Sequence, residues 1–169
     1  IAYRRWLLQS NPRLTSLLSE CIGEGFKKNA QELSRFRMFE NDESVLRRLS
    51  QIKHDNKADF AKFVYNTTGT KLNLDSIFDV QVKRLHEYKR QLLNAFKILA
   101  LYDRLKDDPY AKVPASTFVF AGKAAHSYAF AKESIRFVCA VADLVNADPV
   151  VSRRMKVVFM ENFGVTMGQ

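Results

Sequence analysis

The spacing of apolar residues over the first 70 positions is typical of helices. Asn11-Pro12 predicts a helix start, because proline is favoured in the first turn, and Gly23 predicts its end. Between them, apolar residues recur at the three- and four-residue spacing of one helix face. Similar spacing predicts further helical segments near 29–39 and 42–65, and Thr67–Thr70 ends the series. We therefore expect a helical segment over residues 1–70.

The pattern changes after residue 75. Short β-rich runs at 77–82, 117–121 and 156–160 alternate with long helical patterns near 86–106 and 124–146. Asp-Pro pairs at 108–109 and 148–149 mark stops after the two helices. Such alternation predicts βαβ units with right-handed crossovers and a parallel sheet. The expected fold class is α/β, with residues 71–169 forming a Rossmann-like βαβαβ part that is incomplete.

Composition changes this picture little, but charge adds to it. The chain has 169 residues, 47% of them hydrophobic and 27% charged, as in a soluble domain, and no apolar run approaches the length that spans a bilayer. We therefore expect no membrane partner. Two cysteines cannot form a disulfide scaffold, so we expect buried thiols in a reduced, cytoplasmic compartment. The net charge of +9 makes an anionic partner plausible.

The strongest chemical signal follows the first predicted strand. In a parallel α/β sheet, ligands lie beyond the carboxyl ends of the strands, here residues 83–90, 122–128 and 161–165. Lys83, Arg84, Lys89 and Arg90 gather where a helix is expected to begin. A helix N-terminus is already positive, so each cation there costs on the order of 0.3–1 kcal/mol unless an anion offsets it. We expect the first three to bind a phosphate-sized anion; a solvated basic face is the alternative.

The remaining motifs are weaker. Gly122-Lys123 is more typical of tight packing than of a ligand site, and the stretch after residue 160 resembles an ordinary turn. Trp6, the only tryptophan, is expected in the core. The sequence contains no dinucleotide fingerprint or P-loop and no metal-ligand, Ser/His/Asp or paired-carboxylate spacing. Spacing alone thus predicts an anion site, no metal and no complete catalytic apparatus.

A longer motif carries a family resemblance. Residues 78–94 are Phe-Asp-Val-Gln-Val-Lys-Arg-Leu-His-Glu-Tyr-Lys-Arg-Gln-Leu-Leu-Asn, which resembles the signature of the α-glucan phosphorylases, the glycogen, starch and maltodextrin phosphorylase family. Stretches at 4–12, 122–125, 146–151 and 158–162 resemble the same family in the same order. The resemblance therefore covers the whole chain.

The resemblance implies a GT-B fold, two Rossmann-like domains facing a cleft, with this chain as an internal fragment from the C-terminal domain. The implied reaction is phosphorolysis: inorganic phosphate cleaves the terminal α-1,4 bond of a glucan and releases α-D-glucose 1-phosphate with retention. The implied cofactor is pyridoxal 5'-phosphate, which acts through its phosphate group. The family stretch Gly-Thr-Gly-Asn-Met-Lys, with the Schiff-base lysine, does not occur in this sequence. We expect a homodimer for the intact enzyme and no activity for the fragment.

The resemblance also assigns roles to residues. Arg84 and Lys89 are similar to the residues that grip the substrate phosphate, and Tyr88 to the tyrosine that contacts the glucosyl unit. Lys83 is similar to the lysine near the cofactor phosphate. The other residues at positions of family cofactor contacts are Trp6, Phe163, Gly164 and Val165.

Two alternatives stay open. One is another GT-B glycosyltransferase, such as a nucleotide-sugar glycogen synthase, which would need a nucleotide site. The other is a basic module that binds nucleic acid, suggested by the net charge and by the pairs Arg35/Arg37 and Arg47/Arg48. Acidic residues interspersed in the same helices and the lack of an aromatic stacking motif weigh against it.

Overall fold

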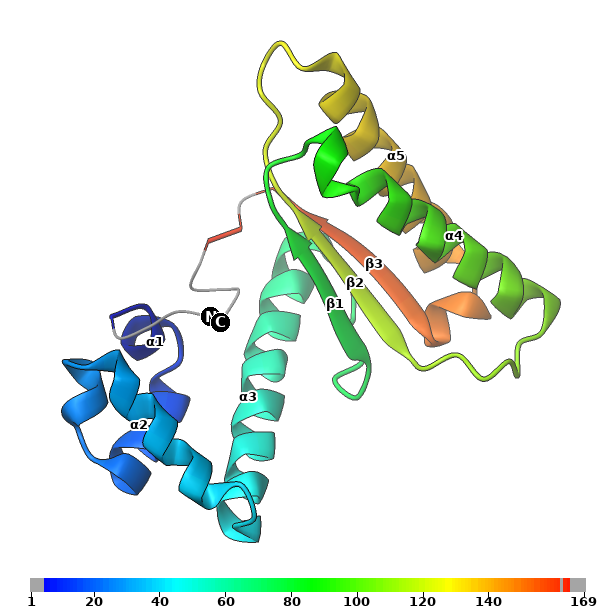
Figure 1. Ribbon diagram of the computed structural model, residues 1–169. Helices are drawn as coiled ribbons and strands as arrows, with labels where there is room; N and C mark the ends of the chain where they lie inside the picture. Colours follow the sequence, from blue (N-terminus) through cyan, green and yellow to red (C-terminus); the bar gives the residue numbers. More distant parts are fainter. Residues whose placement is uncertain (1–4, 162, 165–169) are drawn as a thin grey trace. The chain divides into compact units, whose positions relative to one another are not determined.

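The chain forms two compact units in a computed structural model, which describes residues 5–161, 163 and 164 (Figure 1). Of the described residues, those up to Thr67 form one unit together with Gly164, and Thr68–Phe163 form the other. Each unit has a hydrophobic cluster of its own.

The first unit is helical. Its elements are α1 (Arg5–Ser10), α2 (Pro12–Ile22), η1 (Gly25–Lys27), η2 (Ala30–Phe39) and α3 (Glu43–Thr68). The Asn11 side chain caps α2 by accepting a hydrogen bond from the Leu14 amide at 3.1 Å, and Gly23 ends the helix with a positive φ of 78°. The expected helices near 12–22 and 42–65 are thus confirmed, whereas the segment from Ala30 to Phe39 is a run of 3₁₀ turns.

The second unit contains a three-stranded parallel sheet in the order β1-β2-β3. The strands are β1 (Ile77–Val82), β2 (Ser116–Ala121) and β3 (Met155–Met160). Helix α4 (Gln91–Asp107) joins the first two strands, and α5 (Ala129–Ala147) joins the last two, with short 3₁₀ turns η3 (Glu87–Lys89) and η4 (Val151–Arg153). The expected α/β class with a parallel sheet and flanking helices is confirmed.

Both long helices of this unit lie on the same face of the sheet (Figure 1). Right-handed crossovers between strands laid down in sequential order produce this arrangement. Strand β2 is buried along its whole length, as expected for the central strand of a parallel sheet. Side chains such as Ile98, Val138 and Val157 fill the core beneath the helices.

Two polar side chains complete the end of α5. The Asn146 side chain forms two hydrogen bonds with the backbone of β3. Its Nδ2 donates to the Val157 carbonyl at 2.7 Å, and its Oδ1 accepts from the Val157 amide at 3.0 Å. Asp148 accepts from the amides of Val150 and Val151 and from the Lys106 ammonium, with distances of 2.8, 2.9 and 2.9 Å. These bonds, the one from the Val151 amide first, hold the pKa of the Asp148 carboxyl well below its usual range.

Two helices begin later than their sequence pattern predicts. Helix α4 starts at Gln91 rather than near His86, and α5 starts at Ala129 rather than near Ala124. Arg90 interrupts the helical path because its backbone is left-handed, with φ 57° and ψ 31°, while His86 is extended. Residues 83–90 and 122–128 are therefore loops at the sheet edge, and the predicted first-turn position of the cations is wrong.

Candidate functional site

The three strands end in register at one edge of the sheet. Val82 pairs with Ala121, and Ala121 pairs with Met160. The segments that follow them therefore leave the sheet at neighbouring positions, where α/β proteins bind ligands. We call residues 83–90, which follow β1, the cation loop.

The cation loop starts as a continuation of the sheet. The Lys83 amide donates to the Ala121 carbonyl at 3.0 Å, and the Leu85 amide donates to the Lys123 carbonyl at 3.3 Å. The Leu85 side chain is 7% exposed and anchors the loop in the core. Gly122 allows this close approach, because a β-carbon there would overlap the Lys83 carbonyl oxygen. The small residue after β2 thus has a packing role, as its sequence context suggested.

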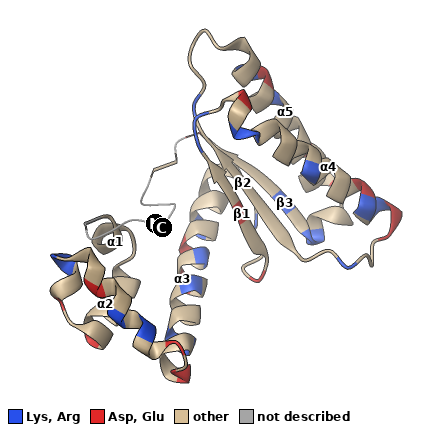
Figure 2. Ribbon diagram, viewed as in Figure 1, with Lys and Arg blue, Asp and Glu red and all other residues tan. Residues whose placement is uncertain are grey.

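The positive charges of this loop form no ion pair with any residue that the structure describes. None of the ion pairs among the described residues involves Lys83, Arg84, Lys89 or Arg90. Figure 2 shows Lys and Arg concentrated in the segment between β1 and α4. The Lys89 ammonium donates to the Arg84 carbonyl at 2.9 Å and lies 5.5 Å from the centre of the Tyr88 ring. The loop therefore offers uncompensated cations to an anion from solvent.

The single carboxylate of the loop is engaged elsewhere. The Tyr128 hydroxyl donates to Glu87 Oε1 at 2.9 Å, which ties the cation loop to the loop after β2. The His86 ring lies 4.3 Å from the Tyr88 ring and 5.4 Å from the Tyr128 ring, centre to centre. Desolvation, followed by the bond to Glu87, raises the pKa of the Tyr128 phenol. Tyr88 itself is 71% exposed, so its ring is open to a ligand.

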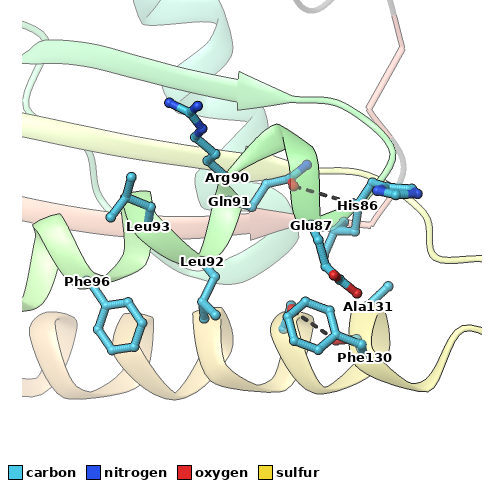
Figure 3. Close-up of a pocket in the computed structure, with 11 residues that line it drawn as sticks. His86, Glu87, Arg90, Gln91, Leu92, Leu93, Phe96, Phe130 and Ala131 are labelled. Carbon is cyan, nitrogen blue, oxygen red and sulfur yellow. Dashed lines mark hydrogen bonds between the residues drawn. The ribbon is translucent and has the colours of Figure 1, made fainter.

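A cavity of about 380 Å³ lies next to the cation loop, between the starts of α4 and α5 (Figure 3). It is mostly apolar, and its walls include Leu85, His86, Leu92, Phe96 and Phe130. Lys83, Arg84 and Lys89 are not among its lining residues. Their proposed roles therefore rest on the loop they share and on the family resemblance, and not on this cavity.

The expected cofactor contacts lie in several places. Trp6 is in α1 of the first unit and is 54% exposed, so the expectation that it packs in the core is wrong. Phe163 is half-buried and Gly164 is exposed, whereas Val165 lies outside the described residues. Lys83, Arg84, Tyr88 and Lys89 all lie in the cation loop. The cofactor contacts of Trp6, Phe163, Gly164 and Val165 stay predictions.

The basic pairs of the first unit differ from the cation loop. Arg35, Arg47 and Arg48 form ion pairs with Glu32, Glu43 and Glu20, at distances between 2.8 and 3.5 Å. Much of the charge that suggested nucleic-acid binding is thus locally compensated.

Three further expectations can be compared with the structure. Cys21 and Cys139 are free but half-buried rather than buried, and desolvation raises the pKa of each thiol. Within residues 5–161, 163 and 164, no group of three or more His, Cys, Asp or Glu side chains is arranged to hold a metal ion. No helix in the same part of the chain is long and apolar enough to cross a membrane.

Sequence comparison decides the family. The sequence model of the carbohydrate phosphorylases matches residues 1–169. The chain belongs to the carbohydrate phosphorylase family. It is 43% identical to human liver glycogen phosphorylase over all 169 residues and 43% identical to the glycogen phosphorylase of Bacillus subtilis. It is 42% identical over 166 residues to that of Synechocystis.

The chain spans about a fifth of the length of these relatives: 20% of the human protein, 21% of the Bacillus protein and 20% of the Synechocystis protein. The match to the phosphorylase model favours a phosphorylase over the nucleotide-sugar synthases considered above. The three-stranded parallel sheet with its flanking helices is consistent with part of a GT-B fold.

Sequence reasoning missed the side chains that hold the cation loop in place. Gln81, Gln91 and Asn94 all hydrogen bond to it or to one another. All three lie within the 78–94 motif, in which residue type alone points only to the charged and aromatic members. A buried amide inside an otherwise amphipathic helix start is the signal that could have identified Gln91.

Proposed function

We propose that this chain forms part of an enzyme that uses inorganic phosphate to cleave the terminal α-1,4 bond of a glucan and release α-D-glucose 1-phosphate. The observation that supports it most is the cation loop: four cations that form no ion pair with a described residue, at the carboxyl edge of a parallel sheet, in a member of the carbohydrate phosphorylase family. The similarity to glycogen phosphorylases favours a storage glucan as the substrate.

In this proposal the loop holds the phosphate substrate. The Arg84 guanidinium can bind two phosphate oxygens at once, and the Lys89 ammonium supplies a point charge. Tyr88, whose ring is exposed, contacts the glucosyl unit in this proposal. Phosphorolysis with a phosphorylated cofactor brings two anions close together, and their repulsion amounts to roughly 4 kcal/mol for unit charges 4 Å apart at an effective dielectric of 20. The cations of the loop offset that repulsion.

The residues present fit pyridoxal phosphate at its phosphate group. Lys83 is exposed, it forms no ion pair with another described residue, and its backbone is fixed against β2, so its ammonium can bind a phosphate without losing a protein partner. Trp6, Phe163, Gly164 and Val165 would form the remaining contacts. When bound, the cofactor supplies proton exchange through its phosphate group. We further propose a homodimeric enzyme, as the resemblance implies, in the cytoplasm, as the cysteine content suggests.

The test is an assay on a full-length phosphorylase that carries this segment. Incubation with glycogen or starch and inorganic phosphate should release glucose 1-phosphate, and release should rise to saturation with phosphate concentration. A chain fully loaded with cofactor that releases no glucose 1-phosphate from any α-1,4-glucan would contradict the proposed reaction.

A further inference from the structure

We propose that Gln91 is a positioning residue for phosphate: its buried side-chain amide fixes the backbone of the cation loop in the geometry that binds the anion. This inference rests on the proposed function, because it assumes that Arg84 and Lys89 hold the substrate phosphate. Gln91 does not touch the ligand in this proposal. It acts through the loop that carries the cations.

The Gln91 side chain forms hydrogen bonds with three backbone groups of the loop. Its Nε2 donates to the Arg84 carbonyl at 3.2 Å and to the Lys83 carbonyl at 3.4 Å. Its Oε1 accepts from the His86 amide at 3.4 Å. Figure 3 shows the side chain extending from the start of α4 toward His86. One amide thus bonds the backbone on both sides of Leu85, at the point where the chain leaves the sheet.

The position of Gln91 makes these contacts rigid. It is the first residue of α4 and is only 4% exposed, so water cannot readily replace its amide as a partner. The Arg84 carbonyl that it contacts also receives the Lys89 ammonium. A shift of this carbonyl would therefore move both of the proposed phosphate ligands.

A second amide holds the other end of the loop. Gln81 Nε2 donates to the Lys89 carbonyl at 3.0 Å, and Gln81 Oε1 accepts from Asn94 Nδ2 at 3.0 Å. Gln81 lies in β1 and Asn94 in α4, so this pair joins the strand, the loop and the helix. The loop is thus fixed near Lys83 and Arg84 by Gln91, and near Lys89 by Gln81.

The test uses Gln91→Met in the full-length phosphorylase. Methionine keeps the length of the side chain but removes the donor and the acceptor. Ile98→Val is the control, because Ile98 is a buried residue of the same helix that packs in the core. The Michaelis constants for phosphate and for glucan are measured together with amide hydrogen exchange of the peptide covering residues 83–90.

We expect Gln91→Met to raise the phosphate KM between about tenfold and a hundredfold, as misplaced binding groups do, while the glucan KM stays within about twofold. Exchange over residues 83–90 should accelerate in the same variant. Ile98→Val should lower the melting temperature but change neither the phosphate KM nor the exchange over residues 83–90. Should Gln91→Met fail to fold, the same measurements on Gln81→Met are expected to change in the same direction, by a smaller factor.

The outcomes separate this inference from the proposed function. A Gln91→Met enzyme with wild-type phosphate KM and wild-type exchange would overturn the positioning role, even if Arg84→Ala impairs phosphate use. Equal increases in the phosphate and glucan KM would also overturn it, because they indicate general damage. If Arg84→Ala itself leaves phosphate use unchanged, the proposed phosphate site is wrong, whatever the exchange data show for the loop.

Discussion

The Lys89 ammonium donates a hydrogen bond to the Arg84 carbonyl oxygen, with 2.9 Å between the two atoms. This contact folds the end of the cation loop back onto its beginning and holds the Lys89 ammonium at the backbone of Arg84. An ammonium has three donors, so two remain for a ligand after this bond. We propose that the Arg84 side chain and these two donors bind the same anion.

Replacing Lys89 by Met should impair phosphate use selectively. A charge-assisted hydrogen bond is worth about 1.5–3 kcal/mol, so kcat/KM for phosphate should fall between about tenfold and a hundredfold. Lys132→Met is the matched control, because Lys132 is an exposed lysine of α5 outside the cation loop. Steady-state kinetics with varied phosphate measure both. Equal effects of the two substitutions would show that the role assigned to Lys89 is wrong.

The close approach of Gly122 to Lys83 leads to a second prediction. In Gly122→Ala the new β-carbon overlaps the Lys83 carbonyl oxygen, so the loop must shift. Overpacking of this kind costs about 1–3 kcal/mol of stability, and we expect the phosphate KM to rise as well.

Gly23→Ala serves as the control for that substitution. Gly23 has a φ of 78° and open space around its α-carbon, so alanine there is strained but displaces no neighbour. It should cost about 1–3 kcal/mol, a loss similar to that of Gly122→Ala, with an unchanged phosphate KM. Thermal melts and phosphate titrations of both variants make the comparison. An unaltered phosphate KM in Gly122→Ala would contradict the importance of this contact.

The lowered pKa of Asp148 predicts a dependence of stability on pH. A carboxyl whose pKa is lower in the folded state stabilises the protein above its unfolded pKa, near 4, and loses this contribution as the pH falls through the folded value. Asp148→Asn should therefore lower the melting temperature of the full-length protein at pH 7, and the difference from wild type should shrink steadily below about pH 4.

Glu133→Gln is the control for this pH series. Glu133 pairs with Arg136 on the exposed face of α5, at 2.9 Å, and such surface pairs contribute little. Melting curves between pH 3 and pH 7 test the prediction. A constant difference between wild type and Asp148→Asn over that range would rule out a stabilising role for the ionised carboxylate.

The sequence predicted the sheet well because its strands are short runs rich in β-branched and aromatic residues, separated by helical patterns with clear stops. Residues 77–82 and 117–121 lie in β1 and β2, and the loop cations follow β1 as expected. The start of α4 could not be predicted in the same way. Residues 83–90 contain neither glycine nor proline, so nothing local marks them as a loop. The loop is formed by tertiary hydrogen bonds from Gln81 and Gln91, which a pattern of apolar spacing does not reveal.

Trp6 shows a different limit of sequence reasoning. A single tryptophan is usually placed in a core because of its large apolar surface, yet this one is 54% exposed in α1. Residue type alone does not determine burial, because the neighbours that would cover the ring are decided by tertiary structure. The role of Trp6 near a cofactor was predicted only from the family resemblance and stays a prediction.

Binding of the substrate phosphate by the cation loop can be measured as the phosphate dependence of glucose 1-phosphate release, compared between wild-type and Arg84→Ala full-length enzymes. Arg136→Ala is the control, since it removes the same charge from the exposed face of α5. We expect kcat/KM for phosphate to fall by about a hundredfold in Arg84→Ala, because a bidentate charged contact is lost, and to stay within about twofold in Arg136→Ala. A phosphate dependence in Arg84→Ala that matches wild type would contradict the claim that the cation loop binds the substrate phosphate.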